Sequence, residues 1–291
     1  MDCRGNMNKE DYIKIAEDKF RKEARDLVLK QINYFYDIKD IMIAKSTYKV
    51  GELVKLKKCS LLHGTYRNIE GLIDIVSNGL IASYFTKGRL SKYPSSVGVW
   101  NIKEECNLID YINYYSGGTI KYNGLLVNNE YSKDYKSEII PYSKMNNLNK
   151  YILDNPCRMW TMEQTKEARF MPSLIQDKVE IGIIFNGDNK YTKELLNGDI
   201  LNPNNVDDNL VCSFINKDYD IESFIKNRHN KDDFFTDRES AILFGLPSNL
   251  IEGILVGRTY ENDKDMLDKI KNLLPNCYIC NLDGIVIVEN S

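Results

Sequence analysis

The chain contains only two histidines, and one of them stands where it could do chemistry. His63 follows an apolar run, and Gly64 and Thr65 come directly after it. The run predicts a strand over Cys59–His63, so the histidine lies at the carboxyl end of a strand, where side chains of a sheet meet a cleft. It could bind a ligand there. The alternative is a core histidine whose hydrogen bonds are satisfied within the protein.

Two aromatic residues eleven positions apart form the second candidate group. Trp100 lies near the end of a predicted strand over Val97–Asn101, and Tyr111 lies in a predicted helix over Lys103–Tyr115. If this helix packs back along the strand, both rings can face one slot and clamp a planar heteroaromatic ligand, at centroid spacings of about 4.5–7 Å. Each ring alone is also typical of a core residue, and other tyrosines of this helix are near-equivalent candidates.

A glutamate late in the chain is the third candidate. Glu239 opens an apolar strand predicted over Glu239–Phe244, which Gly245 and Pro247 end. A carboxylate at the start of an apolar strand is costly to bury unless another group binds it. Glu239 therefore either faces solvent or points into the same cleft as His63.

The elements that must position these residues predict an α+β fold. Strands late in the chain follow one another with few helices between them, which favours a mixed or antiparallel sheet over a doubly wound one. Further strands are predicted at Gly124–Val127, Val179–Asn186, Val211–Ile215, Ile251–Val256 and Ile285–Val288, and further helices at Asn68–Asn78, Ser143–Leu153, Thr192–Asn197, Ile221–Lys226 and Asp263–Leu274.

The helix that follows the histidine is the best specified. Asn68 can cap it, Glu70 lies in its positive first turn, and one side carries an apolar stripe of Ile69, Leu72, Ile73 and Val76. Gly79 is expected to end it in a left-handed conformation. Residues 9–45 also have helical periodicity. They predict an N-terminal helical region over 1–50, packed on a main domain of 51–291; a lid or a partner-binding helix is the alternative.

The composition is that of an ordinary globular protein. Hydrophobic residues make up 43% and charged residues 28%, which argues against disorder, and a net charge of −3 gives no support for a general nucleic-acid binder. The seven cysteines are irregularly spaced, so we expect reduced thiols in a cytosol. Cys277 and Cys280 lack further ligands nearby, so no metal is expected. With no apolar leader and no membrane span, a cytoplasmic location follows, while export without a leader stays open.

Taken together, the three groups resemble the ADP-ribosyltransferase superfamily of the His-Tyr-Glu type, which includes diphtheria-like toxins and poly-ADP-ribose polymerases. The resemblance implies a split mixed or antiparallel sheet with flanking helices, and NAD+ as co-substrate. The residues that carry it are His63, Gly64, Thr65, Trp100, Tyr111 and Glu239.

The family pattern also implies a role for each position. His63 and Thr65 would hold the adenosine-side ribose, and the Gly64 backbone would bind the nicotinamide amide. The two rings would sandwich the nicotinamide, although Trp100 departs from the family, which usually has tyrosine there. Glu239 would bind a hydroxyl of the nicotinamide ribose.

A second, partial similarity is to DarT-type toxins, which modify DNA bases. Those toxins carry a histidine, a threonine two residues on, an asparagine five residues on and an apolar helix ending in glycine, as His63, Thr65, Asn68 and Gly79 do. Their catalytic glutamate opens a strand that ends in Gly-x-Pro, as in "ESAILFGLP". This supports the superfamily and, more weakly, DNA as acceptor.

The resemblance therefore implies a glycosyltransferase, an NAD+-dependent mono-ADP-ribosyltransferase that modifies a protein or nucleic acid and acts as a bacterial toxin or effector. Arg67 is the nearest donor for the NAD+ diphosphate. The basic segment with Lys87, Arg89 and Lys92 is either a solvated loop or a phosphate contact. Two alternatives stay open: an inactive relative that binds NAD+ or ADP-ribose as a sensor or interaction module, and a chance pattern around a core histidine.

Overall fold

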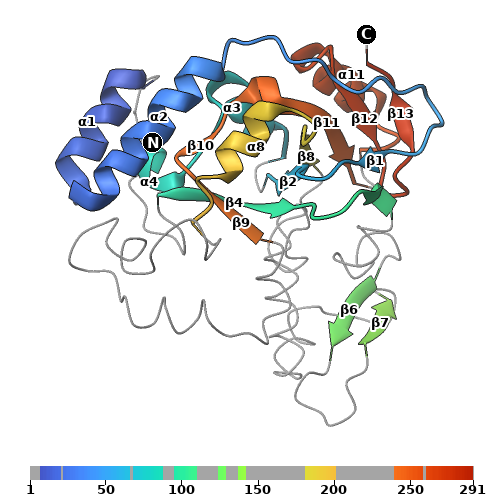
Figure 1. The fold of residues 1–291 in the computed structure, drawn as a ribbon. Helices are drawn as coiled ribbons and strands as arrows, with labels where there is room; N and C mark the ends of the chain where they lie inside the picture. Colours follow the sequence, from blue (N-terminus) through green and yellow to red (C-terminus); the bar gives the residue numbers. More distant parts are fainter. Residues whose placement is uncertain are drawn as a thin grey trace. The chain divides into compact units, whose positions relative to one another are not determined.

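The protein is described here by a computed structural model (Figure 1). It covers residues 7–20, 22–65, 68–87, 95–109, 124–128, 137–141, 181–200, 239–257 and 260–290. For residues 23, 124–128, 137–141 and 239 the description is of the backbone alone. Helices and a mixed β-sheet make up these residues, which confirms the predicted α+β class.

The chain forms two compact units that interleave along the sequence. Unit 1 lies within residues 1–44, 74–101 and 186–251, and unit 2 within 45–73, 102–185 and 252–291. The predicted division into an N-terminal region of 1–50 and a main domain of 51–291 stays a prediction. Each unit is built from segments that are far apart in the sequence.

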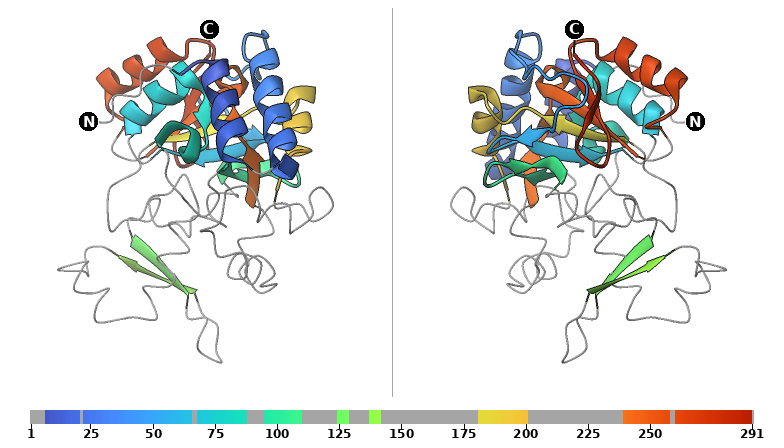
Figure 2. Two further views of the ribbon diagram at one scale, coloured as in Figure 1. Left: turned by 90° about the vertical axis from the view of Figure 1, so that its left-hand side faces the viewer. Right: turned by 90° about the vertical axis from the view of Figure 1, so that its right-hand side faces the viewer.

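The N-terminal region of unit 1 contains two helices, where one periodic stretch was predicted. Helix α1 (Lys9–Lys19) begins at a capping box in which Asn8 and Asp11 each accept a hydrogen bond from the other's backbone N–H at 3.0 Å. Phe20 then takes an extended conformation, and helix α2 (Lys22–Ile38) packs beside α1 (Figures 1 and 2). No helix follows α2 within residues 39–50, so the prediction of helix to residue 45 is wrong there.

An aromatic cluster explains why the helical conformation is interrupted between α1 and α2. Phe20, 3% exposed, stacks on Phe85 of helix α4 (Ser83–Lys87) with ring centroids 5.6 Å apart. Phe244 is fully buried, and its ring centroid lies 5.1 Å from those of Tyr12, Phe35 and Phe85. Aromatic pairs at these separations stabilise a core beyond their buried area. The N-terminal helices thus share one core with the residue that follows the strand of Glu239.

The strands of unit 1 form two antiparallel pairs. β4 (Ser96–Asn101) pairs with β9 (Glu239–Leu243), and β3 (Leu80–Ile81) pairs with β10 (Gly245–Leu246). A 3-10 turn, η3 (Ser248–Leu250), follows β10. The predicted strands at 97–101 and 239–244 are confirmed to within one residue at each end.

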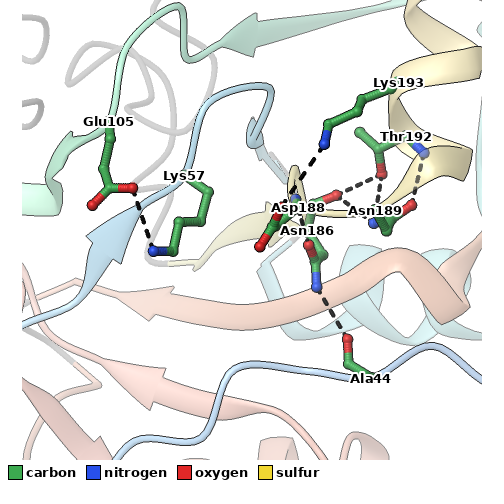
Figure 3. Close-up of polar contacts among 8 residues, drawn as sticks. All are labelled: Ala44, Lys57, Glu105, Asn186, Asp188, Asn189, Thr192 and Lys193. Carbon is green, nitrogen blue, oxygen red and sulfur yellow. Dashed lines mark hydrogen bonds and ion pairs between the residues drawn. The ribbon is translucent and has the colours of Figure 1, made fainter.

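Helix α8 (Lys190–Leu196) completes unit 1 and is anchored at its N-terminus by side chains. Asn189 accepts a hydrogen bond from Thr192 N at 2.8 Å, and Asn186 Nδ2 donates to Ala44 O at 3.2 Å (Figure 3). An exposed ion pair joins Asp188 to Lys193 at 3.8 Å. These contacts tie the start of α8 to the segment that leaves α2.

Unit 2 holds strands in the order β13-β12-β11-β8-β2. β2 (Leu61–Gly64) and β8 (Ile181–Phe185) are antiparallel. β11 (Ile251–Val256) runs parallel to β12 (Tyr278–Cys280), because helix α11 (Lys264–Leu273) connects them as a crossover. β13 (Val286–Val288) closes this series antiparallel to β12, and a separate antiparallel pair joins β6 (Gly124–Asn128) to β7 (Ser137–Pro141).

Several predictions for these elements are confirmed. The strand at Ile251–Val256 has the predicted bounds, and the helix predicted over Asp263–Leu274 has those two residues as its caps. The predictions at Val211–Ile215, Ser143–Leu153 and Ile221–Lys226 fall outside the described residues.

The helix predicted over Lys103–Tyr115 is wrong over residues 103–107. Cys106–Asn107 form the short strand β5, which pairs antiparallel with β1 (Lys55–Leu56), and helical backbone begins at Leu108. Leu108 is fully buried, and its N–H donates to Val54 O at 3.0 Å. Pairing with a distant segment therefore overrides the local helical pattern.

Candidate functional site

The His-Gly-Thr motif lies where the sequence predicted, at the end of a strand. His63 is half-buried on β2 and pairs in register with Ile183 of β8. Thr65, 5% exposed, follows the strand, and its N–H donates to Ile181 O at 3.1 Å. The backbone around the motif is therefore held by β8, while the residues before His63 are buried.

The motif leads directly into helix α3 (Asn68–Asn78), which has the predicted bounds. The N–H of Asn68 donates to Thr65 O at 3.1 Å, and Asn68 takes a left-handed conformation with φ +48°. Asparagine tolerates this conformation better than most residues. The asparagine thus makes a tight turn between strand and helix. Arg67 lies outside the described residues.

Trp100 and Glu239 are brought together by the register of β4 and β9. They occupy directly opposite positions. The N–H of Ala241 donates to Asp199 Oδ1 at 2.8 Å, and its carbonyl accepts from Ile200 N at 3.1 Å. Ala241 and, by alternation, Glu239 therefore turn their backbone groups away from β4. Trp100 and Glu239 form a non-hydrogen-bonded pair, the closer kind, with Cα atoms about 4.5 Å apart.

The environment of Trp100 is that of a core residue. Trp100 is 1% exposed, so neither face of its indole is open to solvent in this structure. The next residue, Asn101, donates from Nδ2 to the hydroxyl of Ser240 at 3.0 Å, and both side chains are buried. The ring pair as a ligand clamp stays a prediction.

The geometry that was expected to place Tyr111 has to be corrected. The argument required a helix that starts at Lys103 and carries Tyr111 about three turns along it, whereas β5 occupies Cys106–Asn107. Helical backbone begins at Leu108, five residues later than this argument requires. Tyr111 itself lies outside the described residues.

The candidate residues thus fall into two groups. His63, Gly64, Thr65 and Asn68 belong to unit 2, and Trp100 and Glu239 to unit 1. Each group has the strand context that was predicted for it. A cleft common to both groups stays a prediction. In the basic segment, Lys87 ends α4 and is exposed, while Arg89 and Lys92 lie outside the described residues.

The paired cysteines at the end of the chain are buried in strand β12 or directly before it. Burial raises the pKa of the Cys280 thiol, and burial also raises that of Cys277 although Lys45 Nζ lies 3.3 Å from its sulfur. A thiol with a raised pKa is a poor nucleophile and metal ligand at neutral pH. Among the residues that the structure describes, no group of three or more His, Cys, Asp or Glu side chains could hold a metal ion.

Comparison of the chain with protein-family models, with curated proteins and with solved structures finds no match. Within the described part of the chain, every helix is too short or too polar to cross a bilayer.

Proposed function

We propose that the protein is an NAD+-dependent mono-ADP-ribosyltransferase with an ADP-ribosyltransferase-like fold. The observation that carries the proposal is the register of β4 and β9, which sets Glu239 at a strand end directly opposite Trp100. The placement of His63 at the end of β2, one short turn before α3, supports it. The acceptor is a protein or a nucleic acid, and the activity suits a bacterial toxin or effector that works in the cytoplasm.

The reaction breaks the bond between the ribose C1′ and the nicotinamide nitrogen of NAD+. The bonding electron pair goes to the ring nitrogen, so nicotinamide leaves as a neutral molecule and needs no proton. The ribose becomes oxocarbenium-like, as in glycoside hydrolysis. The acceptor then forms a bond to C1′ and releases a proton. The enzyme must hold nicotinamide, exclude water and place negative charge near the ribose.

Each candidate residue has a part in this scheme. Glu239 accepts a hydrogen bond from the 2′-hydroxyl of the nicotinamide ribose and stabilises its positive charge. His63 and Thr65 hold the other ribose, and the Gly64 backbone binds the nicotinamide amide. Arg67 and Asn68 lie next to this motif and contact the NAD+ diphosphate side. Trp100 and Tyr111 hold the nicotinamide ring, which requires the buried indole of Trp100 to expose a face when NAD+ binds.

The test is nicotinamide release from NAD+, measured by chromatography with the purified chain. Glu239→Gln should lose on the order of 10²–10³ in turnover, because it removes a charge that acts in the transition state, and should keep the fold and NAD+ binding. Glu105→Gln is the matched control, because Glu105 is exposed and forms a surface ion pair with Lys57 at 3.3 Å (Figure 3). Near-normal turnover of Glu239→Gln would show that Glu239 does not have this role.

The acceptor is identified by the label that NAD+ leaves behind. The protein is incubated with NAD+ labelled in its adenosine part and a whole-cell lysate, and portions are treated with nuclease or protease. Loss of the label after nuclease assigns a nucleic acid, and loss after protease assigns a protein. A lysate that takes up no label, with nicotinamide released, would leave NAD+ hydrolysis as the activity.

The burial of Trp100 favours a second candidate function. Because Trp100 is 1% exposed, its indole offers no open face for nicotinamide in this structure. An inactive relative that binds NAD+ or ADP-ribose as a sensor would not need that face. Calorimetric binding of ADP-ribose without nicotinamide release from NAD+ would support this candidate, whereas release would exclude it.

A further inference from the structure

We infer that Asp199 is a positioning residue for Glu239, acting through the backbone of β9. This role rests on the proposed function, because it matters only if Glu239 acts on a ligand. Asp199 lies in the turn that follows α8, and the sequence gives no sign that this turn meets the strand of Glu239. The structure places its carboxylate on the side of β9 that faces away from β4.

The contacts of Asp199 fix one side of β9 close to its start. Asp199 is 5% exposed, and its carboxylate accepts the N–H of Ala241 at 2.8 Å. The N–H of Ile200 donates to Ala241 O at 3.1 Å, and Asp199 forms an isolated antiparallel bridge with Ile242. Ala241 is two residues beyond Glu239, so both turn their backbone groups to the same side.

The other side of β9 is fixed at the adjacent residue. Ser240 is fully buried and accepts a hydrogen bond from Asn101 Nδ2 at 3.0 Å. The two residues that follow Glu239 are therefore held from opposite sides, one through a side chain and one through the backbone. The backbone position of Glu239 at the strand end therefore depends on these two contacts.

The turn that carries Asp199 is itself held in place. The N–H of Asp199 donates to Leu196 O at 3.1 Å, which ties the turn to the end of α8. Gly198 of this turn packs against Gln31 of α2, since a Cβ at Gly198 would lie 2.4 Å from Gln31 Nε2. The turn is thus bonded to the end of α8 and packed closely against Gln31, next to the carboxylate that contacts β9.

A charged acceptor strengthens this anchor. A hydrogen bond from an N–H to a carboxylate is roughly twice as strong as one to a neutral acceptor. Because misplacement of a reacting group by about 1 Å can cost on the order of 10² in rate, loss of this anchor should lower turnover without weakening NAD+ binding.

The experiment compares three variants by nicotinamide release over a range of NAD+ concentrations. Asp199→Ala should lower kcat about 10-fold or more, with KM changed less than about 2-fold. Asp199→Asn keeps an acceptor oxygen and should recover most of that loss. Asp188→Asn is the control, since Asp188 is an exposed aspartate at the other end of α8, in an ion pair with Lys193, and should behave as the wild type (Figure 3).

A double-mutant cycle separates positioning from general loss of structure. In a Glu239→Gln background, Asp199→Ala should reduce turnover no further, because the group that it positions is already gone. An equal reduction in both backgrounds, or a change in KM alone, would overturn the role of Asp199. An inactive wild-type protein would overturn the proposed function and, with it, this role. The two failures are thus distinguishable.

Hydrogen exchange of the β9 amides gives a readout apart from activity. In Asp199→Ala the Ala241 amide loses its acceptor, so peptides that cover residues 239–243 should exchange faster, while β2 peptides should not change. Unchanged exchange in β9 would show that Asp199 does not hold the strand and would overturn the inference.

Discussion

Replacing Gly79 by alanine should destabilise the protein more than the same change at Gly51. Both glycines take the left-handed region, with φ +83° at Gly79 and +91° at Gly51. Alanine in this conformation costs about 1–2 kcal/mol at either position. Alanine also restricts the unfolded chain by the same amount at both, so this effect cancels in the comparison.

The surroundings of the two glycines differ. A Cβ at Gly79 would lie 2.6 Å from Cζ of Phe35 and 3.0 Å from Leu246 O, whereas a Cβ at Gly51 would have no atom within 4 Å. Carbon atoms pack at about 3.5–4.0 Å, so the Phe35 ring would have to move by about 1 Å. Phe35 is 2% exposed and lies edge-on to Phe244 at 5.1 Å, which leaves it no room.

Overpacking of this kind costs about 1–3 kcal/mol, so Gly79→Ala should lose about 2–5 kcal/mol in total and Gly51→Ala about 1–2 kcal/mol. Urea unfolding followed by circular dichroism measures both. Phe35→Leu combined with Gly79→Ala should cost less than the sum of the single changes, since the smaller side chain relieves the clash. Equal losses at the two glycines, or additive effects in the double variant, would refute the reasoning.

Three other results are expected. Cys277 is 1% exposed and burial raises its thiol pKa, so iodoacetamide should label it about 10-fold or more slower than half-buried Cys59; equal rates in peptide mass spectra would contradict this. Burial, followed by the charge of Tyr12 and nearby acids, raises the pKa of Tyr36 from 10.0 to about 12. The stability that Tyr36 contributes is therefore complete below pH 10 and is lost as the pH rises toward 12; the 295 nm titration of wild type minus Tyr36→Phe should be centred near 12, not 10. Asn249→Ala removes two hydrogen bonds, of 2.7 Å to the carbonyl of Ile38 at the end of α2 and of 2.8 Å to that of Ile41 just beyond it. It should cost about 1–3 kcal/mol in urea unfolding, while an unchanged midpoint would show that water replaces these bonds.

The predictions that were confirmed rest on short-range signals. The bounds of α3 and the left-handed Gly79 follow from an apolar stripe and a glycine within one stretch of chain. The caps of α11 at Asp263 and Leu274 are local in the same way. The positions of His63 and Glu239 at the ends of strands follow from apolar runs that glycine, proline or polar residues interrupt.

The sequence by itself determined several elements, among them α3, α11 and β11, and placed His63 and Glu239 at strand ends, because periodicity, caps and turn residues act over a few neighbouring positions. Tertiary structure alone decided that Trp100 pairs with Glu239, that Asp199 anchors β9, and that Cys106–Asn107 form a strand. The break at Phe20 also depends on a distant partner, Phe85. Pairing register and aromatic packing depend on segments far along the chain, and no local pattern specifies which of them meet.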